Sequence, residues 1–510
     1  MGDLPAARPP VTVPRRKWLC VAYAFPPINR SGTHRTLGFV RHLAHLGWDA
    51  TVLSVRTAGE PVDTELLARL PSSARVIRTR WIEIIPALKR LVGRPWLRKR
   101  TAPNEGIVHR ATGAAEPPAT PIDRPGKRIR EWVSRLLMTP DSRIGWIPFA
   151  VAAGWREMRR TRPSLVYSTS PYASAHLIAL LLATTTRTPW VADFRDPWRD
   201  NPFRVAGPAF LEWLDTFLER SVFRLATHVV FNTPTAREAA CLHAPFLRDK
   251  SSTILNGFDP GILLGITPVR EGASDEFILA HAGEFYGTRT PLPLFEALRW
   301  LLHQIPHLAH RIRLLLIGPG SFDGIPLIEL ARNAGVERHV RVLGRRSHHE
   351  TLARLAGSDA VLVLGSAGSK PELQVPNKLF ELLALRKPMV VVACPSGPVA
   401  AILQDASADA LQCAPNDIQA LAEIIRERAI RRIDARPDPA FWRNVNRYDR
   451  IHRAAEMVNL FNHLSSSRSG NVPTLGEHRL DVSRQEKRRN RQARTHSTPN
   501  SLGFSFVVDK

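Results

Sequence analysis

The residues with the clearest chemical meaning start a helix-like segment between two apolar runs. Lys378 and Glu381 lie in the segment 375–384, which follows the strand-like run 360–364 and precedes the run 389–393. A loop that opens a helix between two buried strands can point its backbone N–H groups at a phosphate. A glutamate one turn inside that helix can reach sugar hydroxyls. The segment also fits an ordinary helix with a solvent-facing glutamate. Other features of the chain are needed to choose between these two interpretations.

Charged and polar residues also follow strand-like runs earlier in the chain. Asp193, Arg195 and Asp196 come at the end of the apolar run 190–194, and His176 lies where an apolar helix opens after another run. Doubly wound sheets place their sites at the carboxyl ends of strands. The three charged residues could orient an acceptor or pair with one another as a structural ion cluster. His176 could contact a substrate or stand as an ordinary residue near a helix start.

A third candidate loop contains Ser31 and Gly32, between the strand-like run 19–24 and the helical stretch 36–46. A glycine at such a turn lets the backbone approach a ligand closely. The loop also fits a plain strand-to-helix turn. It lacks the GxGxxG pattern, which argues against a NAD-dependent enzyme.

Short apolar runs alternate with amphipathic helical stretches along most of the chain, the pattern of a parallel sheet covered by helices on both faces. The pattern stops at 261–275 and then starts again. We therefore expect an α/β protein with two doubly wound, Rossmann-like domains and a ligand cleft between them. The predicted strands are 19–24, 50–55, 165–168, 190–194, 228–232, 253–255, 277–280, 312–317, 340–343, 360–364 and 389–393.

The predicted organisation has five segments. They are a disordered N-terminus at 1–16, a first Rossmann-like domain at 17–265 with a basic insert at 84–140, a second Rossmann-like domain at 272–437, a closing helix at 438–463, and a disordered basic tail at 464–510.

The composition favours anionic partners. The chain has 510 residues and a formal net charge of +25, which suits a lipid surface, a nucleic acid or a phosphorylated substrate. Its four cysteines lack metal-ligand or redox spacing, so they are expected in the core of a protein from a reducing compartment. No apolar run approaches the roughly 20 residues of a spanning helix, and the pair His348-His349 is expected to be a solvated loop.

Five motif regions, in order, resemble the glycosyltransferases of family 4, enzymes of the two-domain GT-B fold. The region from Ser168 to Trp198 closely resembles a subgroup that acts in bacterial envelope-polysaccharide assembly. The five regions are 24–36, 168–198, 256–259, 281–289 and 375–388.

The resemblance implies that residues 17–265 form the acceptor domain, that residues 272–437 form the nucleotide-sugar domain, and that the helix at 438–463 returns to the first domain. It also implies roles for individual residues. Glu381 would grip the ribose of a nucleotide sugar, while Arg289 and Lys378 would neutralise the leaving diphosphate. The implied catalytic set is His176, Asp196, Arg289 and Lys378. The implied donor-binding set is Ser31, Gly32, Gly283, Arg289, Gly318, Lys378, Leu379 and Glu381. The implied acceptor-side set is Asp193, Arg195 and Asp196.

The resemblance further implies a retaining, metal-independent hexosyltransferase without a cofactor. Its donor would be a UDP- or GDP-sugar and its acceptor a lipid-linked saccharide, used in envelope polysaccharide or glycolipid synthesis. One departure concerns the donor motif, in which many relatives carry a second glutamate before the Glu381 position. Leu373 occupies that place here, and the nearest acid is Glu372.

We expect the protein to be cytoplasmic and attached peripherally to the inner face of the cell membrane. The segment 127–138 places Ile129, Trp132 and Leu136 at helical spacing among basic residues, as in a helix that lies in an anionic lipid interface. The same stripe also fits packing on the protein's own core. A non-catalytic GT-B scaffold and a basic nucleic-acid-binding protein remain alternatives, although no nucleic-acid reader module is recognised and no nucleic acid is expected as a partner.

Overall fold

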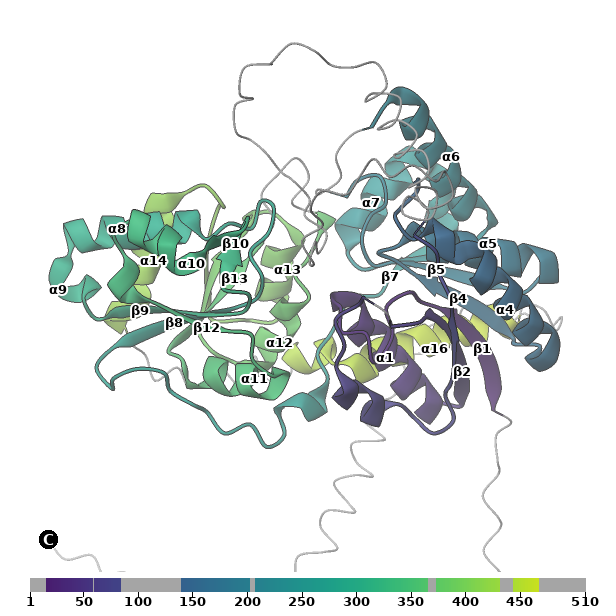
Figure 1. Cartoon of the computed structure of the whole chain (residues 1–510), viewed down its shortest axis with the longest axis horizontal. Helices are drawn as coiled ribbons and strands as arrows, with labels where there is room; N and C mark the ends of the chain where they lie inside the picture. The colour runs from purple at the N-terminus through teal and green to yellow at the C-terminus, as the bar shows by residue number, and fades with distance from the viewer. Residues whose placement is uncertain are drawn as a thin grey trace, which may run out of the picture. The chain divides into compact units, whose positions relative to one another are not determined.

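The computed structural model describes residues 15–57, 59–83, 139–201, 207–365, 373–431 and 444–466. The expected helix at 127–138, most of the basic insert, Glu372 and nearly all of the tail lie outside these residues. The described residues up to Ser465 belong to one compact unit. Two parallel sheets organise it (Figure 1), and we call the residues up to Leu263 the N-terminal half and residues 277–431 the C-terminal half.

The N-terminal half is built on a seven-stranded parallel sheet of order β3-β2-β1-β4-β5-β6-β7. Its central strands are buried on both faces, which is why they read as continuous apolar runs. All five residues of β5, for example, are buried. The strands are β1 Arg16–Val21, β2 Trp48–Val55, β3 Arg75–Thr79, β4 Leu165–Thr169, β5 Trp190–Phe194, β6 His228–Phe231 and β7 Ser251–Thr253.

Helices cover both faces of this first sheet. One face packs against α4 Ile147–Thr161, α5 Ala173–Thr186, α6 Ala209–Leu225 and α7 Pro234–His243. The other packs against α1 Ser31–His45 and α16 Arg450–Ser466, although α16 comes from the far end of the chain (Figure 1). Phe461 of α16 packs edge-on against Trp18, with ring centroids 5.4 Å apart.

The C-terminal half is built on a six-stranded parallel sheet of order β12-β9-β8-β13-β14-β15. The strands are β8 Phe277–Ala282, β9 Ile312–Ile317, β12 Val340–Gly344, β13 Ala360–Leu364, β14 Met389–Val392 and β15 Ala410–Cys413. One face packs against α11 His348–Gly357, α12 Lys378–Leu385 and α13 Pro398–Asp405. The other packs against α8 Leu292–Gln304, α10 Leu327–Asn333 and α14 Ile418–Arg431. The short helix α9 Pro306–Ala309 and the hairpin of β10 Ser321–Phe322 and β11 Ile325–Pro326 complete this half.

The link between the halves depends on a glycine. Phe258 exchanges backbone hydrogen bonds with the entry to α16. Phe258 N donates to the oxygen of Tyr448, two residues before the helix, at 3.0 Å, and Arg450 N donates to Phe258 O at 2.8 Å. A Cβ atom on Gly257 would lie 2.3 Å from Tyr448 O, so a larger residue would separate the two backbones. Asp259, next in the chain, forms ion pairs with Arg41 and Arg69.

The two doubly wound parallel sheets confirm the fold class expected from the sequence. Two strands of these sheets, β3 and β15, were absent from that expectation, as was the short hairpin of β10 and β11. Strand β3 carries Arg75 and Arg78 and is only partly buried, so its sequence lacks a continuous apolar run. Strand β15 has four residues, three of them only partly buried.

Candidate functional site

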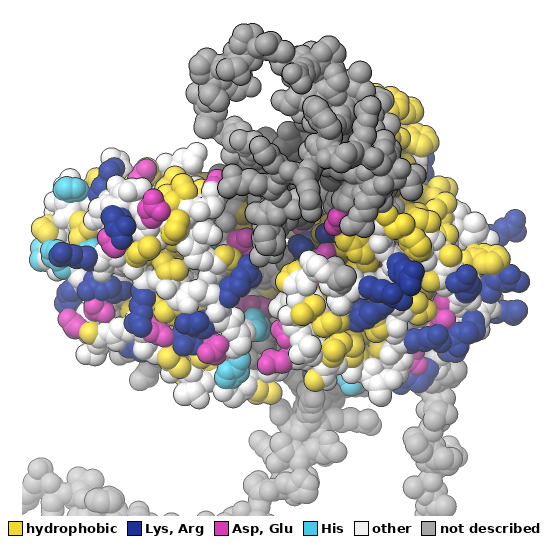
Figure 2. Space-filling view, in the orientation of Figure 1, with side chains coloured by type: hydrophobic (Ala, Val, Ile, Leu, Met, Phe, Trp, Pro, Cys, Tyr) yellow, Lys and Arg dark blue, Asp and Glu magenta, His cyan; other side chains and the backbone are white. Residues whose placement is uncertain are grey.

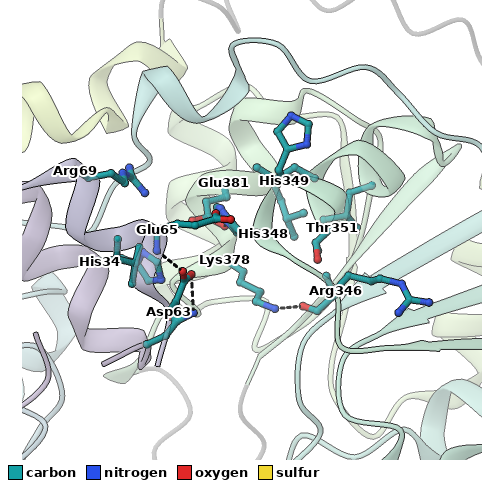
Figure 3. Close-up of a pocket in the computed structure, with 16 residues that line it drawn as sticks. His34, Asp63, Glu65, Arg69, Arg346, His348, His349, Thr351, Lys378 and Glu381 are labelled. Carbon is teal, nitrogen blue, oxygen red and sulfur yellow. Dashed lines mark hydrogen bonds and ion pairs between the residues drawn. The ribbon is translucent and has the colours of Figure 1, made fainter. Parts of the chain in front are cut away.

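A pocket of about 370 Å³ is lined by residues from both halves (Figure 3). Its walls are rich in charged and imidazole side chains. The N-terminal half contributes Asn29, His34, Asp63, Glu65, Leu66 and Arg69. The C-terminal half contributes mainly the starts of α11 and α12, with His348, His349, Thr351, Lys378 and Glu381.

Glu381 faces this pocket from the first turn of α12 (Figure 3). Its side chain is 12% exposed, and His348 Nε2 lies 3.2 Å from its Oε2. Burial raises the pKa of this carboxyl, but the hydrogen bond to His348 and the charges of His348, Arg450 and His34 outweigh burial and bring it to about 2. Glu381 is therefore a negatively charged acceptor at physiological pH.

Two histidines from different halves meet at this carboxylate. His348 is the first residue of α11, and His34 comes from α1. Their rings are stacked, with centroids 6.1 Å apart. Burial, reinforced by the charge of Arg450, lowers the pKa of His34 to about 4, so His34 is neutral at pH 7. The expectation of a solvated loop is wrong for His348.

Lys378 begins α12 one turn before Glu381. Its ammonium donates a hydrogen bond to the backbone oxygen of Ala282 at 2.6 Å (Figure 3). Desolvation lowers the pKa of Lys378, and the charges of Glu381 and Glu284 oppose that shift. A Cβ atom on Gly283 would lie 3.4 Å from this Nζ and 3.2 Å from His281 Nε2. The structure thus brings Lys378, Glu381 and Gly283 to the same region.

Arg289 and Gly318 lie just outside the lining of this pocket. Arg289 Nη1 donates to the Tyr286 hydroxyl at 2.5 Å, and the positive charge of Arg289 helps to lower the pKa of His281. Gly318 packs directly on Gly283, because a Cβ atom on Gly318 would lie 2.0 Å from Gly283 O. Both residues therefore lie near the end of β8, where Ala282 accepts the hydrogen bond from Lys378. Leu379, by contrast, has a fully buried side chain, which leaves its backbone as the part able to meet a donor.

The loop residues of the N-terminal half form a second group. Ser31 and Gly32 begin α1, and a Cβ atom on Gly32 would lie 2.9 Å from Arg195 Nη1. Arg195 pairs with the neighbouring Asp196 at 2.5 Å. Gln374 of the C-terminal half makes a long contact of 3.5 Å to Asp196 Oδ1. Arg195 and Asp196 thus lie where the two halves meet.

Asp193 does not belong to this group. Its side chain is fully buried, and both of its oxygens bind Arg35, at 3.0 and 2.8 Å. Tyr167 and Thr169 also donate to Asp193 Oδ2, at 2.6 and 2.9 Å. Burial raises the pKa of Asp193, but Arg35 and these hydroxyls outweigh it and lower the pKa. The expected acceptor contact is corrected: Asp193 is the centre of a buried ion pair, and its partner is Arg35 rather than Arg195.

His176 is also part of the core. It is fully buried in α5, stacks on Phe194 with ring centroids 4.5 Å apart, and its Nδ1 lies 2.8 Å from Ser168 Oγ. Burial lowers the pKa of this imidazole to about 4. A buried side chain of this kind cannot touch a substrate, so the expected catalytic contact of His176 is corrected.

The part of the chain that the structure describes contains no metal-binding cluster, no disulfide and no membrane-spanning helix. Its residues include no group of three or more His, Cys, Asp or Glu side chains placed to hold a metal ion. All four cysteines are free, and Cys394 is the one that is partly exposed. Among the described helices, none combines the length and apolar character needed to cross a membrane.

Two family models match the sequence. The model described as Glycosyl transferases group 1 matches residues 287–429, and the model described as Glycosyltransferase Family 4 matches residues 107–261. Together the matches cover more than half of the chain. The chain belongs to the family 4-like glycosyltransferases.

Solved structures similar to this glycosyltransferase share its fold at low identity. HepE from Anabaena in complex with UDP-glucose is 14% identical, with a TM-score of 0.56, and the match covers 88% of this chain and all (100%) of that one. Sucrose-phosphate synthase from Thermosynechococcus elongatus is 16% identical, with a TM-score of 0.54 over 89% and 100% of the chains. The lipopolysaccharide outer core galactosyltransferase WaaB is 13% identical, with a TM-score of 0.52 over 89% and 99%. Comparison with curated proteins finds no significant match.

Sequence reasoning missed several residues that shape the pocket of this glycosyltransferase. His34 and Arg69 come from the N-terminal half, and Arg450 begins α16. Arg450 is 6% exposed; burial lowers its pKa, while Glu381 and Asp259 raise it again. These residues carry no motif of their own. A signal existed for His348, because a serine followed by a glutamate three residues later, Ser347 and Glu350, marks a helix start rather than a loop.

Proposed function

We propose that this glycosyltransferase moves a hexose from a UDP- or GDP-sugar to a lipid-linked saccharide, with retention of anomeric configuration and without a metal. It would work in the cytoplasm, at the inner face of the cell membrane, in envelope polysaccharide or glycolipid synthesis. The observation that carries the proposal is the ionised, largely buried Glu381, which faces a pocket shared by both halves.

An ionised carboxylate in that position suits two neighbouring sugar hydroxyls. Each of its oxygens can accept one hydroxyl hydrogen bond, and bonds to charged groups contribute on the order of 1.5–3 kcal/mol. His348 Nε2 lies 3.2 Å from one carboxylate oxygen and helps to hold the side chain in place. HepE, which shares this fold, has been captured with UDP and with UDP-glucose, and that supports a uridine nucleotide as the first donor to test.

The leaving group needs positive charge. When the bond between the sugar C1 and the diphosphate oxygen breaks, the diphosphate keeps the electron pair. The acceptor oxygen bonds to C1, and its hydroxyl proton passes to the departing diphosphate. Arg289 follows Gly283 by six residues, and Lys378 Nζ lies 3.4 Å from the position of a Cβ atom on Gly283, so both provide cations near this strand end. Cations that are already in place stabilise charge as it develops in the transition state.

The acceptor would bind on the side where the N-terminal half presents Arg195 and Asp196. Their ion pair lies next to Gly32 and within reach of Gln374, so an acceptor there would meet the edge of the donor pocket. The likeness to WaaB, named for its action on the lipopolysaccharide outer core, supports an acceptor of the lipid-linked kind.

Donor binding provides the first test. UDP, GDP and their common sugar conjugates would be titrated by calorimetry into the wild-type protein, Glu381→Gln and the control Glu423→Gln. The control changes a half-exposed glutamate of α14 that pairs with Arg426. We expect Glu381→Gln to weaken binding of the preferred nucleotide about tenfold or more, because an amide oxygen accepts weaker hydrogen bonds than a carboxylate. Unchanged affinity in a folded Glu381→Gln protein would remove the ribose assignment.

Turnover provides the second test, with release of UDP or GDP as the readout. Lys378→Ala and Arg289→Ala should each lower kcat by about 10²-fold or more, with a smaller change in KM for the acceptor. Arg299→Ala, at an exposed position of α8, is the matched control and should keep wild-type turnover. Donor binding without turnover in the wild type, over a panel of lipid-linked acceptors, would instead favour a non-catalytic scaffold.

A further inference from the structure

The outer face of α6 carries a row of aromatic side chains. Phe210, Trp213 and Phe217 are 49%, 59% and 56% exposed. Their rings stack along the helix, with centroids 5.9 Å apart for the first pair and 5.8 Å for the second. Figure 2 shows hydrophobic side chains on the outer surface at the place where Figure 1 labels α6. Exposed apolar groups that gather in one place mark interaction sites more often than scattered ones do.

Two arginines extend this row of side chains toward the end of the helix. Phe210, Trp213, Phe217, Arg220 and Arg224 follow one another at intervals of three and four residues, so they lie along one face of the helix. Both arginines are exposed. The face is therefore aromatic over its first turns and basic over its last turns.

The acidic residues of α6 are all bonded to other parts of the protein. Asp215 accepts from the indole of Trp198 at 3.3 Å, and Glu219 accepts from the backbone of Arg199 at 3.2 Å. Glu212 accepts from the backbone of Gly207 at 2.6 Å. Burial also raises the pKa of Glu219 to about 7, so its negative charge is weakened. At helical spacing these three acids also fall on a different side of α6 from the two exposed arginines.

Neighbouring helices in the same layer also expose apolar side chains. Helix α5 packs between α4 and α6 and exposes Leu181, which is 42% exposed. Helix α4 exposes Trp155, and Arg159 lies over its ring at 4.7 Å from the centroid. Exposed apolar side chains thus occur on three adjacent helices, and two of these helices, α4 and α6, also expose arginine.

The position of the aromatic end relates this face to the site. Helix α6 follows β5 after the loop that begins with Arg195 and Asp196. In a doubly wound sheet a helix begins at the edge where the preceding strand ends. The aromatic end of α6 therefore starts from the same edge of the sheet as the predicted acceptor side.

We propose that the outer face of α6, with Trp213 and Phe217 as its central residues, docks the protein on an anionic lipid surface. The inference rests on the proposed lipid-linked acceptor, which has to reach the acceptor side from a membrane. Aromatic rings enter the interfacial region of a bilayer, while arginines bind lipid phosphates at its surface. A second copy of the chain fits this face less well, because a two-fold contact would bring the same arginine-rich surfaces together.

The test is sedimentation of the full-length protein with vesicles. Vesicles of phosphatidylcholine alone and with one-third phosphatidylglycerol would be mixed with wild-type protein, the double variant Trp213→Glu/Phe217→Glu and the control Leu264→Glu/Ile430→Glu. The control residues are 79% and 58% exposed and lie outside the α4–α6 layer. Both double variants add the same charge, so a difference between them reports the position and not the net charge.

We expect anionic vesicles to bind the wild-type protein and the control variant within twofold of each other. The Trp213→Glu/Phe217→Glu variant should partition at least tenfold less, and Arg220→Ala/Arg224→Ala should lose binding mainly at low salt, where exposed charges are least screened. Unchanged thermal unfolding of each variant would show that its fold is intact.

Three results would overturn the proposal. They are equal partitioning of the two glutamate double variants, equal binding to neutral and anionic vesicles, and a wild-type dimer that the α6 variant dissociates without any vesicle binding. Donor titrations without vesicles on the same proteins separate this outcome from the proposed function. If the wild-type protein bound no nucleotide-sugar donor, the proposed function would be contradicted. The vesicle results test only the proposed membrane contact of α6.

Discussion

Asp193 in one half of the molecule and Glu381 in the other are both largely buried next to positive or imidazole side chains, yet the two carboxylates differ in what surrounds them. Asp193 lies within β5 and has no exposed surface, and Arg35, Tyr167 and Thr169 bind its oxygens. Glu381 keeps 12% of its side chain exposed, borders a pocket, and is held by a histidine. Both have a lowered pKa. A lowered pKa therefore does not by itself mark a site, because structural ion pairs lower pKa values as well.

We expect the largest effect on stability from a substitution at Asp193. Asp193→Asn should lower the free energy of unfolding by about 3–5 kcal/mol, because it leaves the buried guanidinium of Arg35 without a counter-charge. Urea unfolding followed by circular dichroism would measure the loss. We expect activity to fall because less of the protein is folded.

Asp196→Asn is the matched control for that change. Its carboxylate pairs with Arg195 but is 23% exposed, so we expect a loss of about 1 kcal/mol or less in stability and a large loss of transfer activity. If Asp193→Asn left the unfolding midpoint unchanged and abolished turnover, Asp193 would have to act on substrate, and the contrast between the two carboxylates would fail.

His176 is a buried base in the same half as Asp193, and its substitution should change stability less than that of Asp193. Because its folded pKa of about 4 lies below the usual value of 6.5, the unfolded chain takes up a proton first as the pH falls. The wild type should therefore lose stability between about pH 6.5 and pH 4, by about 1.4 kcal/mol per pH unit. His176→Phe keeps a flat ring on Phe194 and removes this titration.

Unfolding measured at pH 7.5 and pH 5 would check the His176 prediction. The variant should be within about 1 kcal/mol of wild type at pH 7.5 and gain about 2 kcal/mol relative to wild type at pH 5. It should also keep near-wild-type turnover. A folded His176→Phe protein without turnover would restore the catalytic role that the sequence suggested.

The sequence was sufficient for features that depend on local pattern. Central strands such as β5 and β13 are buried on both faces and read as unbroken apolar runs, whereas β3, with its arginines, does not. The helix start at Lys378 and Glu381 could be predicted for the same reason, because its loop, helix and flanking strands are adjacent in the chain. The structure places both residues on one pocket.

Contacts between distant segments could not be predicted in this way. The partner of Asp193 lies 158 positions away in α1, so its neighbours Arg195 and Asp196 looked like the natural cluster. His34 and His348 meet because one half folds against the other, and neither carries a pattern that points to its partner. A catalytic or structural role can be assigned to a polar residue at a strand end only when its contacts in the folded protein are known.

The smallest effect should come from His348, which tests what keeps Glu381 ionised. In the wild type, the Glu381 pKa of about 2 keeps the carboxylate charged from pH 8 down to pH 4, so this group should not make nucleotide affinity depend on pH in that range. Its contribution to stability is present above about pH 4.5 and is lost as the pH falls toward 2. His348→Gln removes the opposing charge, so burial should raise the pKa of Glu381. We then expect UDP or GDP affinity to be about fivefold weaker at pH 5 than at pH 7.5, a cost of about 1 kcal/mol.

Calorimetric titrations at pH 5 and pH 7.5 would measure this difference in the wild type, in His348→Gln and in the control His349→Gln. His349 lines the same pocket and has no described bond to Glu381, so its variant should follow the wild-type pH profile. Equal profiles for all three proteins would mean that His348 does not set the charge of Glu381. The distinction between the two carboxylates would then rest on solvent access to Glu381 alone and not on the kind of partner that each one has.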